Sequence, residues 1–106
     1  MYAIDARSQT VNGKKFRTFS RNVRHKNTDI DVEAGTTGFR GYVPREQSAR
    51  SFLSLNCKRG DFLFKPIQDE DGWITGFDIA CCSDGELMGL VDSLAFALQA
   101  LTDRWE

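Results

Sequence analysis

Helical periodicity is confined to the last quarter of this 106-residue chain, and this restricts the fold more than any other feature. Ser83 and Glu86 have the spacing of a capping box, which predicts that a helix begins there. Apolar residues then recur at helical spacing towards Trp105; they are Leu87, Leu90, Val91, Leu94, Leu98 and Leu101. This stripe predicts an amphipathic helix that packs on an apolar sheet face, with a partner-binding helix as the alternative.

Phe96 lies off this stripe, near Gly89 and Asp92. Two interpretations stay open for it. An exposed phenylalanine at this position would mark a dimer contact. A phenylalanine at the flank of the helix would instead be covered by a loop.

The preceding residues form short alternating stretches between turn signals. Asn12-Gly13 separates two such stretches and is typical of a type I′ hairpin, in which both central residues need positive φ. Phe16 and Phe19 break the alternation and predict a bulge. Strands are expected at residues 2–11, 14–24, 29–34, 50–57, 61–67 and 73–80. The predicted fold is therefore α+β, with an antiparallel β-sheet of about five to six strands packed by one C-terminal amphipathic helix, in a single domain over residues 1–106.

Charge is distributed unevenly along the chain. Residues 1–60 hold 12 Lys and Arg against 5 Asp and Glu, whereas residues 61–106 hold 2 against 10, and the net charge is −1. Such a split favours a face that attracts anions, or else basic and acidic strands that compensate each other. The sequence pI of about 5.8 argues against long nucleic acid as a partner.

Apolar runs of the length of a membrane span are absent from the sequence, and residues 1–7 do not form a signal peptide. The three cysteines are expected to be buried free thiols in a reducing compartment, which predicts a cytoplasmic protein. Cys57, Cys81, Cys82 and His25 lack zinc-site spacing, so no metal is expected. A single histidine and the absence of nucleophile motifs predict no catalytic residues and no cofactor.

The segment from Gly35 to Gly41 is rich in glycine and is the main candidate for a binding site. Glycines let backbone N–H groups converge on an anion, threonines add hydroxyl donors, and arginine is suited to phosphate. Aromatic side chains among these cations are typical of nucleotide binding. A structural connection between strands is the alternative for this loop. The candidate ligand-binding residues are Gly35, Thr36, Thr37, Gly38, Phe39, Arg40, Tyr42 and Arg50.

The stretch Val32-Glu33-Ala34-Gly35-Thr36-Thr37-Gly38, together with the helix that begins at Gly85-Glu86-Leu87, is similar to the pattern of small uncharacterised phage and bacterial proteins. The overall plan, a sheet followed by a C-terminal helix, resembles the Thoeris anti-defence sponge proteins of phages. The similarity covers residues 30–56 and 83–101, and Arg50-Ser51-Phe52 stands where that pattern has Arg-Thr-Tyr. The resemblance implies a dimer or higher oligomer that sequesters cyclic nucleotide signals without cleaving them.

The first functional hypothesis is thus a non-enzymatic homo-oligomer that binds a nucleotide-like anion, in the host cytoplasm if the gene is phage-encoded. Arg40 and Arg50 would hold phosphate, Thr36 and Thr37 would donate hydrogen bonds, and Phe39 or Tyr42 would stack on a base. The second is an immunity-type or inhibitor protein that presents acidic residues to a basic partner. Those residues are Asp61, Asp69, Glu70, Asp71, Asp78 and Asp84. The third is an enzyme that uses His25 with a cysteine or a carboxylate.

Overall fold

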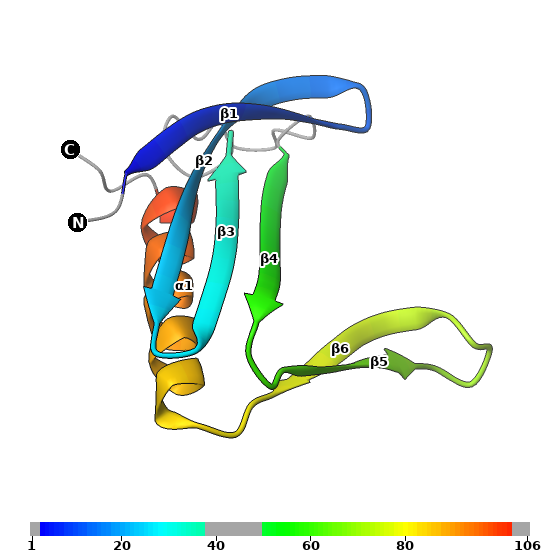
Figure 1. The fold of residues 1–106 in the computed structure, drawn as a ribbon. Coiled ribbons are helices and arrows are strands. Elements are labelled where there is room, and N and C mark those ends of the chain that lie inside the picture. The colour runs from blue at the N-terminus through cyan, green and yellow to red at the C-terminus, as the bar shows by residue number, and fades with distance from the viewer. Residues whose placement is uncertain (1–2, 38–49, 103–106) are drawn as a thin grey trace.

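A computed structural model of the protein describes residues 3–37 and 50–102. In this part of the chain, six strands precede one helix. They are β1 (Ile4–Val11), β2 (Lys14–His25), β3 (Thr28–Thr36), β4 (Ser51–Arg59), β5 (Leu63–Gln68), β6 (Ile74–Ala80) and α1 (Asp84–Thr102). The first four strands form one antiparallel sheet in the order β1-β2-β3-β4, and β5 and β6 form a separate antiparallel pair (Figure 1). The predicted α+β class with a C-terminal helix is confirmed.

The β1–β2 hairpin has the predicted turn. Asn12 and Gly13 have φ values of 48° and 82°, as a type I′ turn requires. The predicted bulge in the second strand is wrong, because β1 and β2 pair in continuous register from Ile4–Arg21 to Val11–Lys14. Phe16 and Phe19 are an odd number of positions apart, so they lie on opposite faces of the strand.

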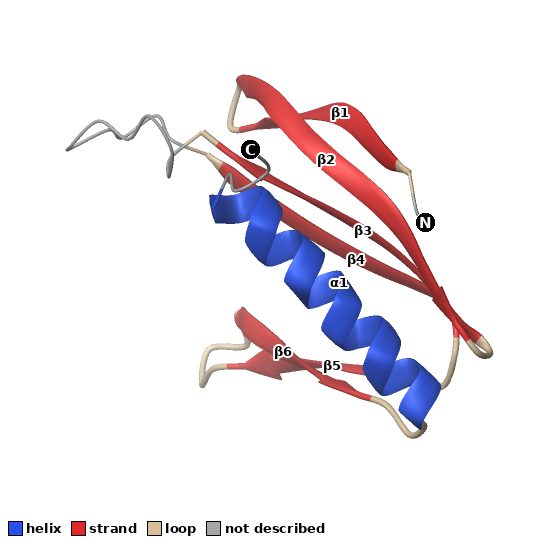
Figure 2. Ribbon diagram, turned by 90° about the vertical axis from the view of Figure 1, so that its left-hand side faces the viewer, coloured by secondary structure: helices blue, strands red, loops and turns tan. Residues whose placement is uncertain are grey.

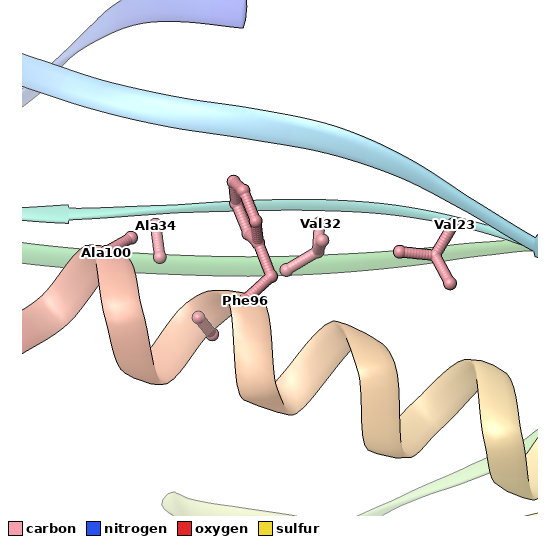
Figure 3. Close-up of a cluster of buried hydrophobic side chains, with 6 residues drawn as sticks. Val23, Val32, Ala34, Phe96 and Ala100 are labelled. Carbon is pink, nitrogen blue, oxygen red and sulfur yellow. The ribbon is translucent and has the colours of Figure 1, made fainter. Parts of the chain in front are cut away.

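The core lies between α1 and the centre of the main sheet (Figure 2). Phe96, Ala97 and Ala100 pack on a group of small apolar residues from β2 and β3, shown in Figure 3. That group consists of Val23, Val32 and Ala34, with Phe19, Leu55 and Leu101 at its margin. α1 therefore covers the sheet through contacts with β2 and β3 and barely touches β4.

The predicted orientation of the helix is wrong. The residues of α1 that face the sheet are Glu86, Gly89, Ser93, Phe96, Ala97 and Ala100. Most of them are small, and a Cβ at Gly89 would lie 2.8 Å from Thr28 Cγ2. This face lets the helix approach the strands closely, while Leu87, Val91, Leu94 and Leu98 remain exposed.

The position of Phe96 differs from both of the positions that the sequence suggested. Its side chain is 1% exposed and lies in the core between helix and sheet (Figure 3). The guanidinium carbon of Arg21 lies 5.7 Å from the centroid of its ring, which is within the range of a cation–π contact. Phe96 is therefore the large side chain that fills the space left by its small neighbours.

The predicted capping box at the start of α1 is confirmed. The backbone N–H of Glu86 donates to Ser83 Oγ at 3.3 Å, and the backbone N–H of Ser83 donates to Glu86 Oε1 at 3.2 Å. Within residues 3–37 and 50–102, no helix combines the length and the apolar character that crossing a bilayer requires.

The β5–β6 hairpin projects away from the main sheet (Figure 1). Large apolar side chains are exposed along it, and Trp73 is 72% exposed. The others are Leu63, Phe64, Ile67, Ile74 and Phe77. This hairpin gives the molecule extents of 44 × 42 × 19 Å and leaves a substantial apolar surface open to solvent.

Candidate functional site

The described residues of the predicted site meet where β3 ends and β4 begins. Thr37 and Arg50 form a reciprocal pair: the backbone N–H of Thr37 donates to Arg50 O at 3.0 Å, and the backbone N–H of Arg50 donates to Thr37 Oγ1 at 3.0 Å. Thr36 Oγ1 donates to Arg50 O at 3.2 Å and lies 2.8 Å from Ser51 Oγ. These contacts hold the two strand ends together at the base of the connection between β3 and β4.

The side chain of Arg50 joins this base to the β1–β2 turn. Arg50 Nε donates to the carbonyl oxygen of Val11 at 3.0 Å. The turn carries Lys14 and Lys15 immediately after Asn12-Gly13. The contact therefore brings basic residues of the first hairpin to the same end of the sheet as Thr36 and Thr37 (Figure 1).

Gly35 has a packing role at this end. A Cβ on Gly35 would lie 2.6 Å from Arg17 O and 2.8 Å from Thr18 Cα, which is closer than side chains approach backbone atoms. The absence of a side chain thus lets β3 lie directly against β2. Gly38, Phe39, Arg40 and Tyr42, the remaining residues of the predicted site, lie outside the described residues.

Positive charge is concentrated at this end of the sheet, which we call the basic end. It is formed by residues 8–17, 35–37 and 50–53, which include Lys14, Lys15, Arg17 and Arg50 but no Asp or Glu. A shallow depression of about 510 Å³ opens beside it; its lining includes Arg7, Lys15, Phe16 and Arg17. Cations beside hydroxyl groups suit an anionic ligand, and the carboxylate of Glu33 borders this end through its hydrogen bond from Gln9 Nε2.

A second group of basic residues lies at the other end of the strands and is largely compensated. It lines a recess of about 420 Å³ formed by Arg24, His25, Thr28, Asp29, Lys58 and Arg59. Arg24 Nε lies 3.7 Å from Asp29 Oδ2, and Lys58 Nζ lies 3.0 Å from Asp31 Oδ2. His25 Nε2 lies 2.7 Å from Asp92 Oδ2 and so joins β2 to α1. These carboxylates make the recess a weaker anion site than the basic end.

A polar network on the sheet face opposite α1 was not anticipated. Glu33 is 8% exposed, and its Oε2 accepts hydrogen bonds from Thr18 Oγ1 at 2.6 Å and Gln9 Nε2 at 2.8 Å. Asp29, Asp31 and Glu33 alternate along β3 and so share one face of that strand, but sequence alone did not show that strands on either side supply donors.

Asp31 belongs to the same network and borders a cavity of about 200 Å³ there. Burial raises the pKa of its carboxyl group, but hydrogen bonds from Asn22 Nδ2 and Lys58 outweigh this and hold the pKa below its usual value. Asp31 and Glu33 together make this cavity unfavourable for an anion.

The acidic residues and cysteines are dispersed in different surroundings. Asp69 Oδ1 accepts hydrogen bonds from the backbone N–H groups of Asp71 and Trp73 at 2.9 and 3.0 Å, which stabilises the β5–β6 turn. The cysteines are free; Cys57 and Cys81 are half-buried and Cys82 is exposed, so the prediction of burial is wrong for Cys82 and met only in part by the other two. Among residues 3–37 and 50–102, no group of three or more His, Cys, Asp or Glu side chains could hold a metal ion.

No protein-family model, curated protein or solved structure matches this chain. Its function is therefore argued from its own geometry.

Proposed function

We propose that the protein is a non-enzymatic binding protein that sequesters a nucleotide-derived anion at the basic end. The observation that carries the proposal is the convergence of Arg50, Thr36 and Thr37 with the lysines of the β1–β2 turn. A phosphate group needs such a combination of cations and hydrogen-bond donors.

The proposed ligand contacts come from the end of β3, from the start of β4 and from the segment that joins them. Arg50 and Arg40 bind phosphate, Thr37 supplies a hydroxyl donor, Thr36 positions Arg50 by donating to its carbonyl oxygen, and Phe39 or Tyr42 stacks on the base. Sequestration needs binding alone and no turnover. The resemblance to Thoeris anti-defence sponges makes a cyclic nucleotide immune signal the ligand, bound by a homo-oligomer in the host cytoplasm.

A thermal-shift series against mono-, di- and cyclic nucleotides tests this proposal. A ligand at 100 times its Kd stabilises a fold by about 2.7 kcal/mol, so the wild-type Tm should rise by several degrees. Arg40→Ala should abolish the shift. Arg59→Ala, which removes a cation at the opposite end of β4, should retain it. A wild-type protein that shows no shift with any nucleotide would contradict the proposal.

The β5–β6 hairpin favours a second candidate, an inhibitor or immunity-type protein. Its turn presents Asp69, Glu70 and Asp71 beside the exposed ring of Trp73, an aromatic anchor with an acidic surround. Binding to a basic nuclease should then be weakened by Glu70→Lys and by added salt, whereas Arg40→Ala should leave it unchanged. Binding that resists both Glu70→Lys and salt would exclude this candidate.

A further inference from the structure

The exposed side of α1 carries a regular apolar seam. Leu87, Val91, Leu94, Leu98 and Leu101 are separated by four, three, four and three residues, which is the heptad spacing of helices that pack on other helices. The first four are about half exposed or more, and Leu98 is 63% exposed. Leu101 lies at the margin of the core, but within residues 3–37 and 50–102 the side chains of Leu87, Val91, Leu94 and Leu98 take no part in it.

The β5–β6 hairpin is the second apolar surface that no element of residues 3–37 and 50–102 covers. Its register places Phe64 opposite Ile79 and Pro66 opposite Phe77, so one face of the hairpin is almost entirely apolar. Two-stranded hairpins in water are marginally stable unless a further layer packs on them. Among the described elements, neither α1 nor the main sheet supplies that layer (Figure 2).

The size of the molecule agrees with apolar surfaces that are left exposed in the single chain. The radius of gyration is 15.3 Å, whereas a compact chain of this length has about 13 Å. With roughly 150–200 Å² for each large side chain, the seam and hairpin expose on the order of 1,000 Å² of apolar surface. A stable interface of standard size buries about 800 Å² on each partner.

We propose that the leucine seam and the β5–β6 hairpin form the interface with a second copy of this chain. The two seams pack antiparallel about a two-fold axis, and each hairpin lies against the other copy. The seam contains no charged residue, so two identical seams meet without like charges between them. In a two-fold contact the same surface serves both copies, as a self-complementary apolar seam allows. The proposal specifies the surfaces of the proposed homo-oligomer and does not depend on nucleotide binding.

The mass of the protein in solution, measured without nucleotide, tests the proposal. The wild type should have twice the chain mass of 12.0 kDa in sedimentation equilibrium. Leu94→Glu should raise the dissociation constant about 100-fold or more, because Leu94 is the middle residue of the seam. Gln99→Glu, at an exposed position of α1 outside the seam, is the matched control and should remain dimeric. Circular dichroism should show that all variants are folded.

Charge complementation tests whether seam meets seam. In an antiparallel two-fold pair, residue 94 lies at the axis and faces its own copy. Leu94→Glu and Leu94→Lys should therefore be monomeric separately and form a heterodimer when mixed, since opposite charges then meet. Phe77→Glu should also weaken the dimer. A monomeric wild type would overturn the proposal and point to a different protein as the occupant. A mixture that stays monomeric would overturn the contact between the two seams. If Phe77→Glu leaves the dissociation constant unchanged, the β5–β6 hairpin is not part of the interface.

The readouts of the two proposals are separate. A dimer that shows no thermal shift with nucleotides would support this interface and exclude nucleotide binding. A monomer that binds nucleotide would support nucleotide binding and exclude this interface.

Discussion

At Gly35 a single missing side chain determines how closely two strands pack. The position was predicted from sequence as part of an anion-binding loop, a role that stays a prediction. The structure shows a further reason for glycine there, which is the contact with the backbone of Arg17 and Thr18.

Gly35→Ala should destabilise the fold by about 1–3 kcal/mol, because the new methyl group forces the backbones of β2 and β3 apart. Gly76→Ala is a matched control in β6, where the nearest atom to an added Cβ is Ile67 Cδ1 at 3.7 Å. Urea unfolding of both variants measures the difference. Equal effects of the two substitutions would argue against the close packing of β2 and β3.

Glu86 joins three segments through one carboxylate. Its Oε2 accepts a hydrogen bond from the backbone N–H of Asp61, and its Oε1 accepts from Cys82 at 2.9 Å and from Ser83. The backbone donor at Asp61 is the main cause that holds the pKa of Glu86 below its ordinary value of 4.5, followed by the donor at Cys82. The capping box was readable from sequence because it is local, whereas the contact with Asp61, 25 residues away, was not.

Because the pKa of Glu86 is lowered, the stability of the fold depends on pH. A carboxyl group whose pKa is lower in the folded state stabilises the fold above its unfolded pKa, and the contribution is lost as the pH falls through the folded value. Glu86→Gln cannot ionise, so it should be less stable than wild type at neutral pH and should converge with it on acidification below about pH 4. Denaturant unfolding across this range checks the prediction. A constant difference at all pH values would contradict it.

At the scale of elements, α1 shows where hydrophobic periodicity is ambiguous. The pattern predicted the existence, start and helical spacing of this element, but it assigned the larger side chains to the sheet. Gly89, Ser93, Ala97 and Ala100 lie at helical spacing as well, and their small size lets the helix lie close to β2 and β3. The apolar stripe of α1 was the clearer of the two helical patterns, but it did not identify the face that packs on the sheet of the same chain.

Ala97→Leu should destabilise the fold by about 1–3 kcal/mol, since Ala97 is buried against the sheet and an added isobutyl group overpacks it. Ala95→Leu makes the same change two residues away at an exposed position and should alter stability by less than about 0.5 kcal/mol. Unfolding at one fixed protein concentration compares them. Equal losses at Ala95 and Ala97 would argue against the observed orientation, in which Ala97 is buried and Ala95 is exposed.

The β5–β6 hairpin shows a second limit. Its strands were predicted because strand propensity and alternation are local. Its separation from the main sheet was not predicted, because alternation within a strand does not specify the neighbouring strand.

At the scale of the whole molecule, the unequal distribution of charge in the sequence becomes a separation in space. The basic end lies where β4 begins, whereas the acidic β5–β6 turn lies at the tip of the hairpin that projects from the other end of β4 (Figure 1). The sequence therefore predicted which residues have the chemistry for an anion. It did not predict the link from Arg50 to Val11 that gathers them, because that contact joins residues 39 positions apart.

A dimer joined by α1 would also make thermal stability depend on protein concentration. The Tm of the wild type should rise by a few degrees for each 100-fold increase in concentration, because association favours the folded state by mass action. The Tm of Leu94→Glu should remain nearly constant over the same range. Calorimetry at several concentrations measures both, and a wild-type Tm independent of concentration would argue against the dimer.

The layer between α1 and the strands joins parts of the chain that are made at different times. Val23 and Val32 leave the ribosome about sixty residues or more before Phe96 and Ala97, which cover them. Until α1 has been synthesised, the apolar face of β2 and β3 has no cover of its own. We therefore expect the nascent chain to depend on chaperones during this interval, and a stop codon placed before Asp84 to give an aggregating product instead of a smaller folded one.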